Sequence, residues 1–330
     1  MSAINAIRAS AADSQQEQDE LRERCGLLDR SERGKLALAG AGAAGFLNGQ
    51  VTNDVEGLQA GEGCYAAFLT HKGKMLGDLR ILRAEDELLL DTERVALQSL
   101  FDMIRRFKIG FDVELHKRTI ERGLLSLIGP RAREIASTAG ADALPPAVEH
   151  AHCATSIAGR PVRLIATAAP EGLDVLCEAD DLDAARFALV NAGALPVSEE
   201  SAQALRVELG VPRYGVDLDE SVIPQEAGLN ERAVSFTKGC YVGQETVARL
   251  YYRGKPNRLL RGLLLCEPAA TAEPVHLGQR LVGHLGSTAI SPSLGPIALC
   301  LLRHEAAPGQ HVMVGEHERP AEVVELPFSA

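Results

Sequence analysis

The chain has 330 residues, of which 46% are hydrophobic and 24% charged, and its formal net charge is −11. Such a length should divide into two or three domains. The negative charge argues against a general nucleic-acid binder, which needs a basic surface, and no apolar run reaches the roughly 20 residues that span a bilayer. We therefore expect no direct nucleic-acid partner and no membrane association.

The first residues, MSAINAIRASAADSQQEQDE, lack the apolar core of a secretory signal and are rich in Gln, Asp and Glu. We interpret residues 1–21 as a polar tail and expect a cytoplasmic protein. The 7 cysteines are odd in number and have no CxxC spacing, which predicts reduced thiols. His150, His152 and Cys153 form one candidate metal fragment, but it has no second half with ligand spacing, so we assign no metal site.

A glycine-rich turn follows the first apolar segment. Residues 36–39 form a predicted strand, and GAGAAG at 40–45 is a literal GxGxxG, the dinucleotide-binding fingerprint. A dinucleotide site needs a full helix after the glycines and an acid at the end of a second strand. Asn48-Gly49 interrupts the helix, and Glu56 does not end an apolar strand. We interpret the motif as a turn between a strand and a short helix.

Two units of strands and helices come next. Their order, β-β-α-β and then β-α-β-β-α, suggests an antiparallel sheet with helices on one face, followed by a split βαβ or ferredoxin-like unit. Periodicity predicts strands over 64–69, 75–82, 88–90, 111–115, 124–128, 162–166 and 173–177, and helices over 97–104, from Pro130 and over 182–191.

The tract from 202 to 250 is rich in Gly, Pro and acidic residues. A predicted helix over 202–209 ends at Gly210, and the residues after it are typical of a long, specifically folded loop that carries function. Within this loop, KGCYVGQETVAR (238–249) places a cysteine between two glycines and then continues as a predicted helix.

Cys240 in this turn admits two interpretations. Lys238, two residues away, and a nearby helix start would favour the thiolate, which makes Cys240 a candidate reactive thiol. Free cysteine is also among the most buried residue types, so a structural cysteine is the alternative. Composition and spacing leave both open.

These residues carry a family resemblance. The run RxExGxPxYGxDxxxxxxPxEAGL (206–229) resembles the glycine-cleavage T-protein and its relatives. KGCYxGQE (238–245) resembles one branch of that superfamily, the folate-binding YgfZ family, which is related to mitochondrial iron–sulfur assembly factors. Shorter similar segments lie at 50–54, 73–76, 283, 291–292, 294–295 and 297–298, so that the resemblance covers about residues 27–328.

The resemblance implies an α+β protein with two interleaved ferredoxin-like domains and a small C-terminal β-barrel around a central folate-sized hole. We expect a first α+β domain over 22–118, a second over 119–255 with scope to interleave with the first, and the barrel over 256–330. Short strand signals for the barrel lie at 259–266, 279–285, 297–302 and 311–314.

The resemblance also implies site residues and a cofactor, tetrahydrofolate. Glu208 would hold the polar edge of the pterin, because a carboxylate accepts two N–H donors at once. Asp78 lies near the acid that T-proteins place beside the reacting folate nitrogen, whereas Gly77 stands where they often carry a second acid. The remaining implied cofactor-binding residues are Arg206, Tyr214, Gly239, Tyr241, Gln244 and Glu245.

Two functions are implied by this resemblance. The first is a tetrahydrofolate-binding protein that supports assembly or repair of iron–sulfur clusters in client enzymes, including tRNA-modifying ones, with Cys240 as the functional thiol beside Lys238. Stable clusters want about four ligands, so a client protein, a second subunit or a small thiol would supply the rest. The alternative is a folate-dependent aminomethyl- or methyltransferase in which Asp78 carries the chemistry. A third possibility is a folate-binding scaffold without turnover.

Overall fold

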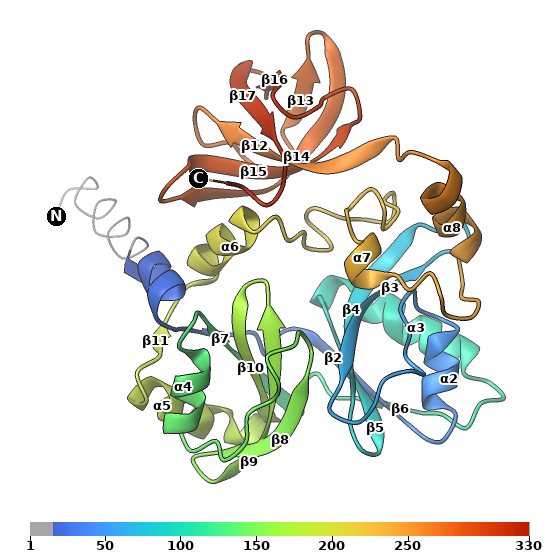
Figure 1. The fold of residues 1–330 in the computed structure, drawn as a ribbon, viewed down its shortest axis with the longest axis vertical. Coiled ribbons are helices and arrows are strands. Elements are labelled where there is room, and N and C mark those ends of the chain that lie inside the picture. The colour runs from blue at the N-terminus through green and yellow to red at the C-terminus, as the bar shows by residue number, and fades with distance from the viewer. Residues whose placement is uncertain (1–15, 330) are drawn as a thin grey trace.

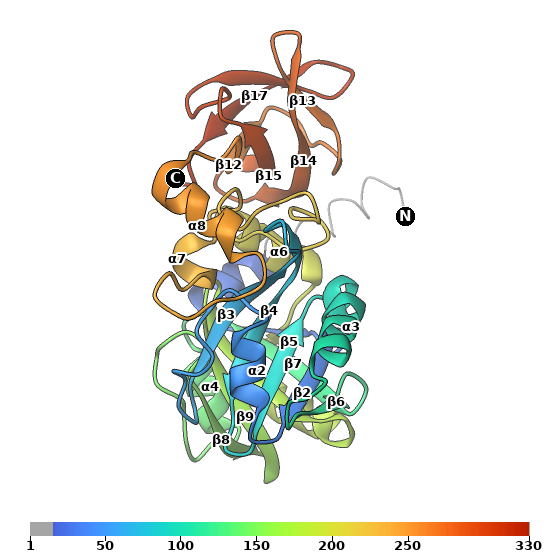
Figure 2. The same ribbon diagram turned by 90° about the vertical axis from the view of Figure 1, so that its right-hand side faces the viewer.

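The structure, a computed structural model, describes residues 16–329. Two open β-sheets lie side by side, and a closed barrel sits across one end of the pair (Figures 1 and 2). The expected α+β class and the C-terminal barrel are thus confirmed. Within residues 16–329, no helix combines the length and the apolarity needed to cross a membrane.

The first sheet has five strands, all paired antiparallel, and its helices pack on one face. Leu100 and Ile104 on the helix side of this sheet are fully buried, as the helical spacing predicts. In spatial order the strands are β3 (Gly63–Leu69), β4 (Met75–Arg83), β5 (Glu87–Thr92), β2 (Gly34–Ala39) and β6 (Glu114–Lys117), and the helices are α2 (Ala43–Asn48), η1 (Arg94–Ala96) and α3 (Leu97–Phe107).

The second sheet has six strands and draws its first strand from the start of the chain. β1 pairs antiparallel with β7 and parallel with β11. The spatial order is β11 (Leu195–Pro196), β1 (Gly26–Asp29), β7 (Arg122–Ile128), β10 (Glu171–Glu178), β9 (Arg160–Ala168) and β8 (His152–Ile157), with the helices α4 (Ala132–Thr138), η2 (Ala179–Asp181) and α5 (Leu182–Asn191).

The position of β1 corrects the expected boundary of the first domain. A first domain over 22–118 would include β1, yet its hydrogen bonds place it in the second sheet. The two sheet units are therefore interleaved in sequence. Residues 1–15 of the expected polar tail lie outside the described part, but residues 16–23 are helical and Leu21 is buried against Leu28 and Ile128. The packed chain therefore begins before residue 22.

The two sheets turn their helix-free faces toward each other. Leu82 and Leu89 of the first sheet meet Leu124, Ile165 and Leu176 of the second in a small apolar cluster. The helices lie on the outer faces, α2 and α3 on one side and α4 and α5 on the other (Figure 1). Charged side chains that point inward from either sheet are consequently brought together.

The barrel closes with six antiparallel strands around its own core. It rests on helix α6 (Glu199–Glu208), where Val207 packs against Leu260, Ile297 and Leu299. The sequence signals find four of its strands and miss β13 and β17. In spatial order the barrel strands are β12 (Arg258–Leu265), β15 (Gly295–Arg303), β14 (Arg280–Ser291), β13 (Pro274–Leu277), β16 (His311–Val314) and β17 (Arg319–Val324).

A long irregular segment joins α6 to the barrel, as expected. It contains the short α7 (Asn230–Ala233) and α8 (Gln244–Arg253), and it returns to the first sheet, because Tyr214, Leu229 and Val247 are buried in that core. The segment thereby contacts both the first sheet and the barrel, which gives it a position suited to a functional site.

The GAGAAG turn has its own packing explanation. Gly40 has a φ of +104°, and a Cβ there would lie 2.4 Å from the carbonyl oxygen of Asp112. The amide of Gly42 donates to that same oxygen at 3.0 Å. The helix after the turn, α2, has only six residues. These glycines accommodate Asp112 of the same chain, in agreement with the interpretation of the motif as a turn.

Candidate functional site

A central cavity of about 160 Å³ lies where the two sheets and the segment after α6 meet. Its lining comes from distant parts of the chain and is strongly charged, with both arginines and carboxylates. Of the ten predicted site residues, Asp78, Arg206 and Tyr214 line this cavity, and the other seven are not among its described lining residues. Further charged or hydrogen-bonding residues of the lining are Arg33, Tyr65, Arg80, Asp91, Glu149, His150, Asp174, Arg213 and Arg232.

A buried charge network joins the two sheets on one wall of the cavity. Arg80 on β4 donates to Asp91 on neighbouring β5 at 2.7 Å and to Asp174 on β10 of the second sheet at 2.6 Å. All three side chains are at most 10% exposed. Burial alone would raise the pKa of Asp91, but Arg33 and Arg80 together hold it below its usual range. This wall is therefore charged, paired and rigid.

Among the described carboxylates that line the cavity, Asp78 is the one without a direct ion pair. It lies on β4 and is 5% exposed, and its Oδ2 accepts a hydrogen bond of 2.7 Å from the hydroxyl of Tyr65 on β3. Burial raises the pKa of Asp78 to about 6, although the Tyr65 hydrogen bond opposes the rise. The group therefore titrates near neutral pH, which suits a residue that holds or exchanges a proton.

Glu149, His150 and Arg232 form another part of the lining. The guanidinium of Arg232 pairs with Glu149 and lies over the ring of Tyr65, 5.0 Å from its centroid. His150 is 8% exposed, and neither ring nitrogen has a hydrogen-bond partner among the described residues. Arg232 thus lies beside Tyr65, and His150 lines the same cavity with its Nε2 3.8 Å from Glu149 Oε1.

The turn at 238–245 lies at a different place on the first sheet. The ammonium of Lys238 donates to the backbone carbonyls of Asn48, Val51 and Asn53, at 2.5, 2.9 and 2.8 Å. Burial lowers the pKa of Lys238 to about 8. From the sequence, Lys238 was expected to favour the Cys240 thiolate. In the structure its ammonium is instead taken up by three backbone carbonyls. Lys238 fastens the turn to the loop that follows α2.

Cys240 itself is exposed, whereas Cys25, Cys177 and Cys300 are buried. The alternative of a buried structural cysteine is therefore wrong. All seven cysteines are free thiols, as predicted from their number and spacing. The structure thus leaves the Cys240 sulfur open to a partner.

The neighbours of Cys240 divide by burial. Tyr241 is buried in the core of the first sheet, and the ammonium of Lys238 lies 5.3 Å from its ring centroid. Gln244 begins α8, and Glu245 is exposed in the first turn of that helix. Gly239 has open space where a Cβ would be, whereas Gly243 has a φ of +86° and faces the carbonyl of Thr70. Tyr241 and Gly243 therefore hold the turn, while Gly239 and Glu245 face outward.

Hydrogen bonds connect the turn to the cavity. Lys238 binds the carbonyl of Asn53, the side-chain amide of Asn53 donates to the carbonyl of Tyr65 at 2.9 Å, and the Tyr65 hydroxyl donates to Asp78. The Thr52 hydroxyl holds the same segment against α7, because it donates to the carbonyl of Ala233, next to Arg232, at 2.6 Å. The QVTND segment at 50–54 therefore joins the thiol turn to the cavity wall.

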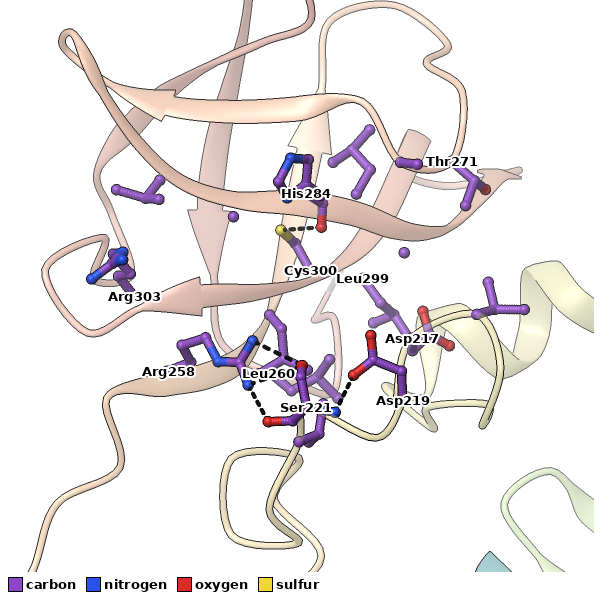
Figure 3. Close-up of a pocket in the computed structure, with 18 of the residues that line it drawn as sticks. Asp217, Asp219, Ser221, Arg258, Leu260, Thr271, His284, Leu299, Cys300 and Arg303 are labelled. Atoms are coloured by element: carbon purple, nitrogen blue, oxygen red, sulfur yellow. Dashed lines mark hydrogen bonds between the residues drawn. The ribbon is translucent and has the colours of Figure 1, made fainter. Parts of the chain in front are cut away.

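A second cavity, of about 460 Å³, lies between the barrel and the loop at 216–222 (Figure 3). Arg258 donates to the carbonyl of Ser221 at 2.9 Å and to Glu226 at 3.0 Å, and the Cys300 thiol donates to the carbonyl of His284 at 3.0 Å. Within the described chain, none of its lining residues has a buried side-chain polar atom without a partner. We therefore place the candidate site in the central cavity.

Comparison with known proteins agrees with this architecture. The model for the GCVT N-terminal domain matches residues 6–238, and that for the glycine cleavage T-protein C-terminal barrel domain matches residues 258–329. The chain belongs to the glycine cleavage T-protein family. An aminomethyltransferase of Streptomyces avermitilis is 30% identical over 93% of this chain and 87% of its own length. One of Rubrobacter xylanophilus is 29% identical over 94% and 85%.

A solved T-protein shows the same fold. The glycine cleavage system aminomethyltransferase T from Bartonella henselae superposes with a TM-score of 0.85 over 96% of this chain and 89% of its own, at 22% sequence identity. At 22% identity this similarity establishes the fold alone.

Within the T-protein family, this chain has no room for a second acid beside Asp78. A Cβ at Gly77 would lie 2.6 Å from the ring of Phe68 and 2.7 Å from the Cβ of Ala96. Contacts this short do not occur between real side chains, so a side chain at 77 would force Phe68 and Ala96 apart. The single acid is thus built into the packing.

Glu208 is not brought to the cavity that Asp78 lines. Its carboxylate accepts two hydrogen bonds from Arg22, at 2.6 and 2.7 Å, beside the end of α6. Arg206 is also engaged within the protein, with Asp217 at 3.1 Å and Ser287 at 2.5 Å, and ties α6 to the barrel. The pterin-holding role expected of Glu208 would require its pair with Arg22 to open.

Sequence reasoning missed several residues of the cavity. Tyr65, Glu149, Asp174 and Arg232 come from separate segments and have no motif of their own. The sequence pattern suggests His150 only as a metal ligand. The ring of His152 instead contacts Glu62 and Arg163, while His150 lines the cavity. Among residues 16–329, no three His, Cys, Asp or Glu side chains come together as a metal site.

Proposed function

We propose that this protein binds tetrahydrofolate at the central cavity and supports assembly or repair of iron–sulfur clusters in client enzymes, including tRNA-modifying ones. The observation that carries the proposal is the exposed Cys240 on a turn that hydrogen bonds fasten to the cavity wall through Asn53 and Tyr65. A thiol held in this way is accessible to a client protein and is connected to the ligand site through hydrogen bonds.

The residues of the cavity fit the pterin of a folate. Four buried side-chain nitrogens of its lining lack partners in the described chain, namely Arg80 Nε, Arg206 Nε and both ring nitrogens of His150. A flat ring with several donors and acceptors would satisfy such atoms. The cavity is smaller than the roughly 300 Å³ that enclose a drug-sized ligand, so the rest of a folate would extend outside it. We interpret the surrounding sheets as the two ferredoxin-like domains.

Asp78 and Tyr65 would act on the reactive side of that ring. Tetrahydrofolate, when bound, supplies nitrogens that carry a one-carbon unit. Because burial raises the pKa of Asp78 to about 6, the carboxyl exchanges its proton close to neutral pH, and the Tyr65 hydroxyl fixes the orientation of Oδ2. Arg232 lies over Tyr65 and holds its ring in place.

Cys240 would act toward the client. A thiolate is a good ligand for iron, but a single cysteine leaves about three cluster positions to be filled by the client, a second subunit or a small thiol. Lys238 and Tyr241 hold the turn, so that the sulfur is presented from a fixed backbone.

A second candidate function is folate-dependent aminomethyl or methyl transfer, and the comparisons favour it over the first. Both relatives named above are aminomethyltransferases, and each match covers over nine-tenths of this chain. Asp78 in the cavity would then carry the chemistry, and Cys240 would have no part in it. The single acid at 78, with no room for another at Gly77, is the feature that separates this chain from that activity.

The two candidate functions make different predictions for a variant that lacks the Cys240 thiol. In a strain that lacks this protein, we expect a Cys240→Ala variant to lose most of its support of cluster-dependent enzymes. Cys266→Ala is the matched control, because Cys266 is also an exposed free thiol but lies beyond the end of β12. Full support by Cys240→Ala would overturn the thiol function, and an equal loss in both variants would show a general effect of cysteine removal.

Two further measurements complete the test. Formation of methylenetetrahydrofolate from an aminomethyl-loaded carrier protein, undiminished in Cys240→Ala, would establish the second candidate. Calorimetric titration of the folded protein with tetrahydrofolate tests the ligand that both candidates share, and an absence of binding would refute both.

A further inference from the structure

His150 is the most unusual polar residue of the central cavity. Its backbone has a φ of +67°, in the left-handed region that few residues other than glycine adopt. The conformation is held from both sides, because the His150 amide donates to the carbonyl of Ala166 at 2.9 Å and its own carbonyl lies against Gly63. Glu149 beside it is fixed by Arg232. The chain thus directs this one ring into the cavity.

The ring is buried and makes no hydrogen bond within the described chain, although its Nε2 lies 3.8 Å from a carboxylate oxygen of Glu149. His150 is 8% exposed, yet neither Nδ1 nor Nε2 has a hydrogen-bond partner in the described chain. Its neighbour His152 contrasts with it, since both nitrogens of that ring contact Glu62 or Arg163. A buried polar group without a hydrogen-bond partner destabilises the folded protein, and such groups are rare in native structures.

Burial is the main reason that the ring stays neutral. Burial lowers the pKa of His150 to about 4; Glu149 opposes this change, while Arg80 and Arg232 add to it. A neutral imidazole has one N–H donor and one acceptor nitrogen. Arg80 lines the same cavity and contributes an unpartnered donor, its Nε, while its two terminal nitrogens are held by Asp91 and Asp174.

We propose that His150 is a ligand-binding residue of the central cavity, whose ring donates one hydrogen bond to a flat heteroaromatic ligand and accepts another from it. This inference rests on the proposed function, in which the ligand is the pterin ring of tetrahydrofolate. An edge that alternates amide and amine groups matches an imidazole of this kind, and Arg80 Nε lines the same cavity as a further donor. His150 thereby selects ligands with both a donor and an acceptor.

The first test is calorimetric titration with tetrahydrofolate under reducing conditions. His150→Phe keeps a ring of similar size and removes both nitrogens, and we expect its affinity to fall at least tenfold. His150→Asn restores a donor and an acceptor, and asparagine tolerates a positive φ, so it should recover part of the loss. The melting temperature of each variant without ligand shows that it is folded.

The second test reads the ring directly. With ¹⁵N-labelled histidine, the His150 nitrogen signals are assigned by their loss in His150→Asn. We expect the shifts of a neutral ring at pH 7 and a change in both nitrogens when tetrahydrofolate is added, which a purely structural histidine would not show.

The outcomes distinguish a failure of tetrahydrofolate binding from a failure of the role of His150. If the wild-type protein does not bind tetrahydrofolate, the proposed function fails and this inference fails with it. If the wild type binds and His150→Phe binds equally well, or if the ring signals stay unchanged on binding, only the role of His150 is overturned.

Discussion

The central cavity buries charged side chains, whereas the turn at 238–245 exposes a thiol. The cavity buries Asp78, Arg80, Asp91 and Asp174 at 7% exposure or less, and it draws them from three strands of two sheets. The turn presents one exposed thiol from a single short segment. A local motif is enough to build the turn, whereas the cavity exists only once both sheets have formed and packed.

This difference shows which interactions determine the stability of each region. In the cavity, stability depends on buried charges that must stay paired. It also depends on Asp78, because burial opposes the ionisation of this carboxyl. In the turn, stability depends on backbone geometry, namely the carbonyls that Lys238 gathers and the left-handed conformation of Gly243. Substitutions should therefore act through charge in the cavity and through backbone strain in the turn.

The largest expected effect comes from Arg80→Met. Its removal leaves the carboxylate of Asp174 with the hydroxyl of Ser126 as its remaining partner and weakens the pairing of Asp91. Breaking a buried pair on one side costs about 3 to 5 kcal/mol, because the other charge stays buried without compensation. Urea unfolding of the variant at pH 7 measures the loss in the free energy of unfolding.

The control for Arg80 is an exposed pair. Arg105→Met removes the ion-pair partner of Asp102 on α3, which keeps its hydrogen bond from Gln98. The side chains of Arg105 and Asp102 are 69% and 48% exposed, so the variant should change the stability by less than about 1 kcal/mol. Equal losses in the two variants would mean that the network between the sheets contributes no more than a surface pair.

Asp78→Asn tests the same cavity through pH. The folded-state pKa of Asp78 is about 6 against 3.8 for an ordinary aspartate, so the folded protein binds the proton more tightly than the unfolded chain. Stability is therefore lost as the pH rises from about 4 to 6, and the full penalty of about 3 kcal/mol is present above pH 6. Removing the charge should stabilise the protein at pH 8 by up to that amount, and at pH 4.5 by about 1 kcal/mol.

The difference between the stability gains at pH 4.5 and pH 8 tests whether the ionisation of Asp78 is their source. The amide oxygen of the variant can still accept from Tyr65, so the hydrogen bond of 2.7 Å need not be lost. Asp102→Asn, at an exposed position, controls for the change of net charge. A gain in stability that is the same at pH 4.5 and pH 8 would show that the ionisation of Asp78 is not its source.

Much of the fold was predictable because local patterns determine it. The helix predicted over 182–191 matches α5 and the strand over 311–314 matches β16. The strand predicted from Phe111 begins only at Glu114, because Phe111 is half exposed and packs its ring on Phe46 instead of joining the sheet. β8, β13 and β17 were missed because they lack a clear apolar alternation.

The candidate site divides in the same way. The turn with Cys240 was found because its residues are adjacent in sequence, and Asp78 and Tyr214 came from the resemblance. The surroundings of Asp78 were not found. Tyr65 reaches Asp78 only through the pairing of β3 with β4, and Arg232 joins the same cavity only through the return of the segment after α6. The pairing of Glu208 with Arg22 escaped for the same reason, because 186 residues separate the two.

The smallest predicted effect belongs to the turn, and it separates the two glycines that flank Cys240. Gly243 has a φ of +86°, and a Cβ there would lie 2.6 Å from the carbonyl oxygen of Thr70, so Gly243→Ala should cost about 2 kcal/mol in the free energy of unfolding. Gly239 has no atom within 4 Å of a Cβ position, so Gly239→Ala should change it by less than about 0.5 kcal/mol. Thermal and urea unfolding of the two variants provide the comparison, with the alkylation rate of Cys240 as a second readout. Because strain at Gly243 reaches Thr70 and not the cavity, tetrahydrofolate affinity should stay unchanged in both folded variants. A loss of affinity in Gly243→Ala would mean that the turn and the cavity respond as one unit.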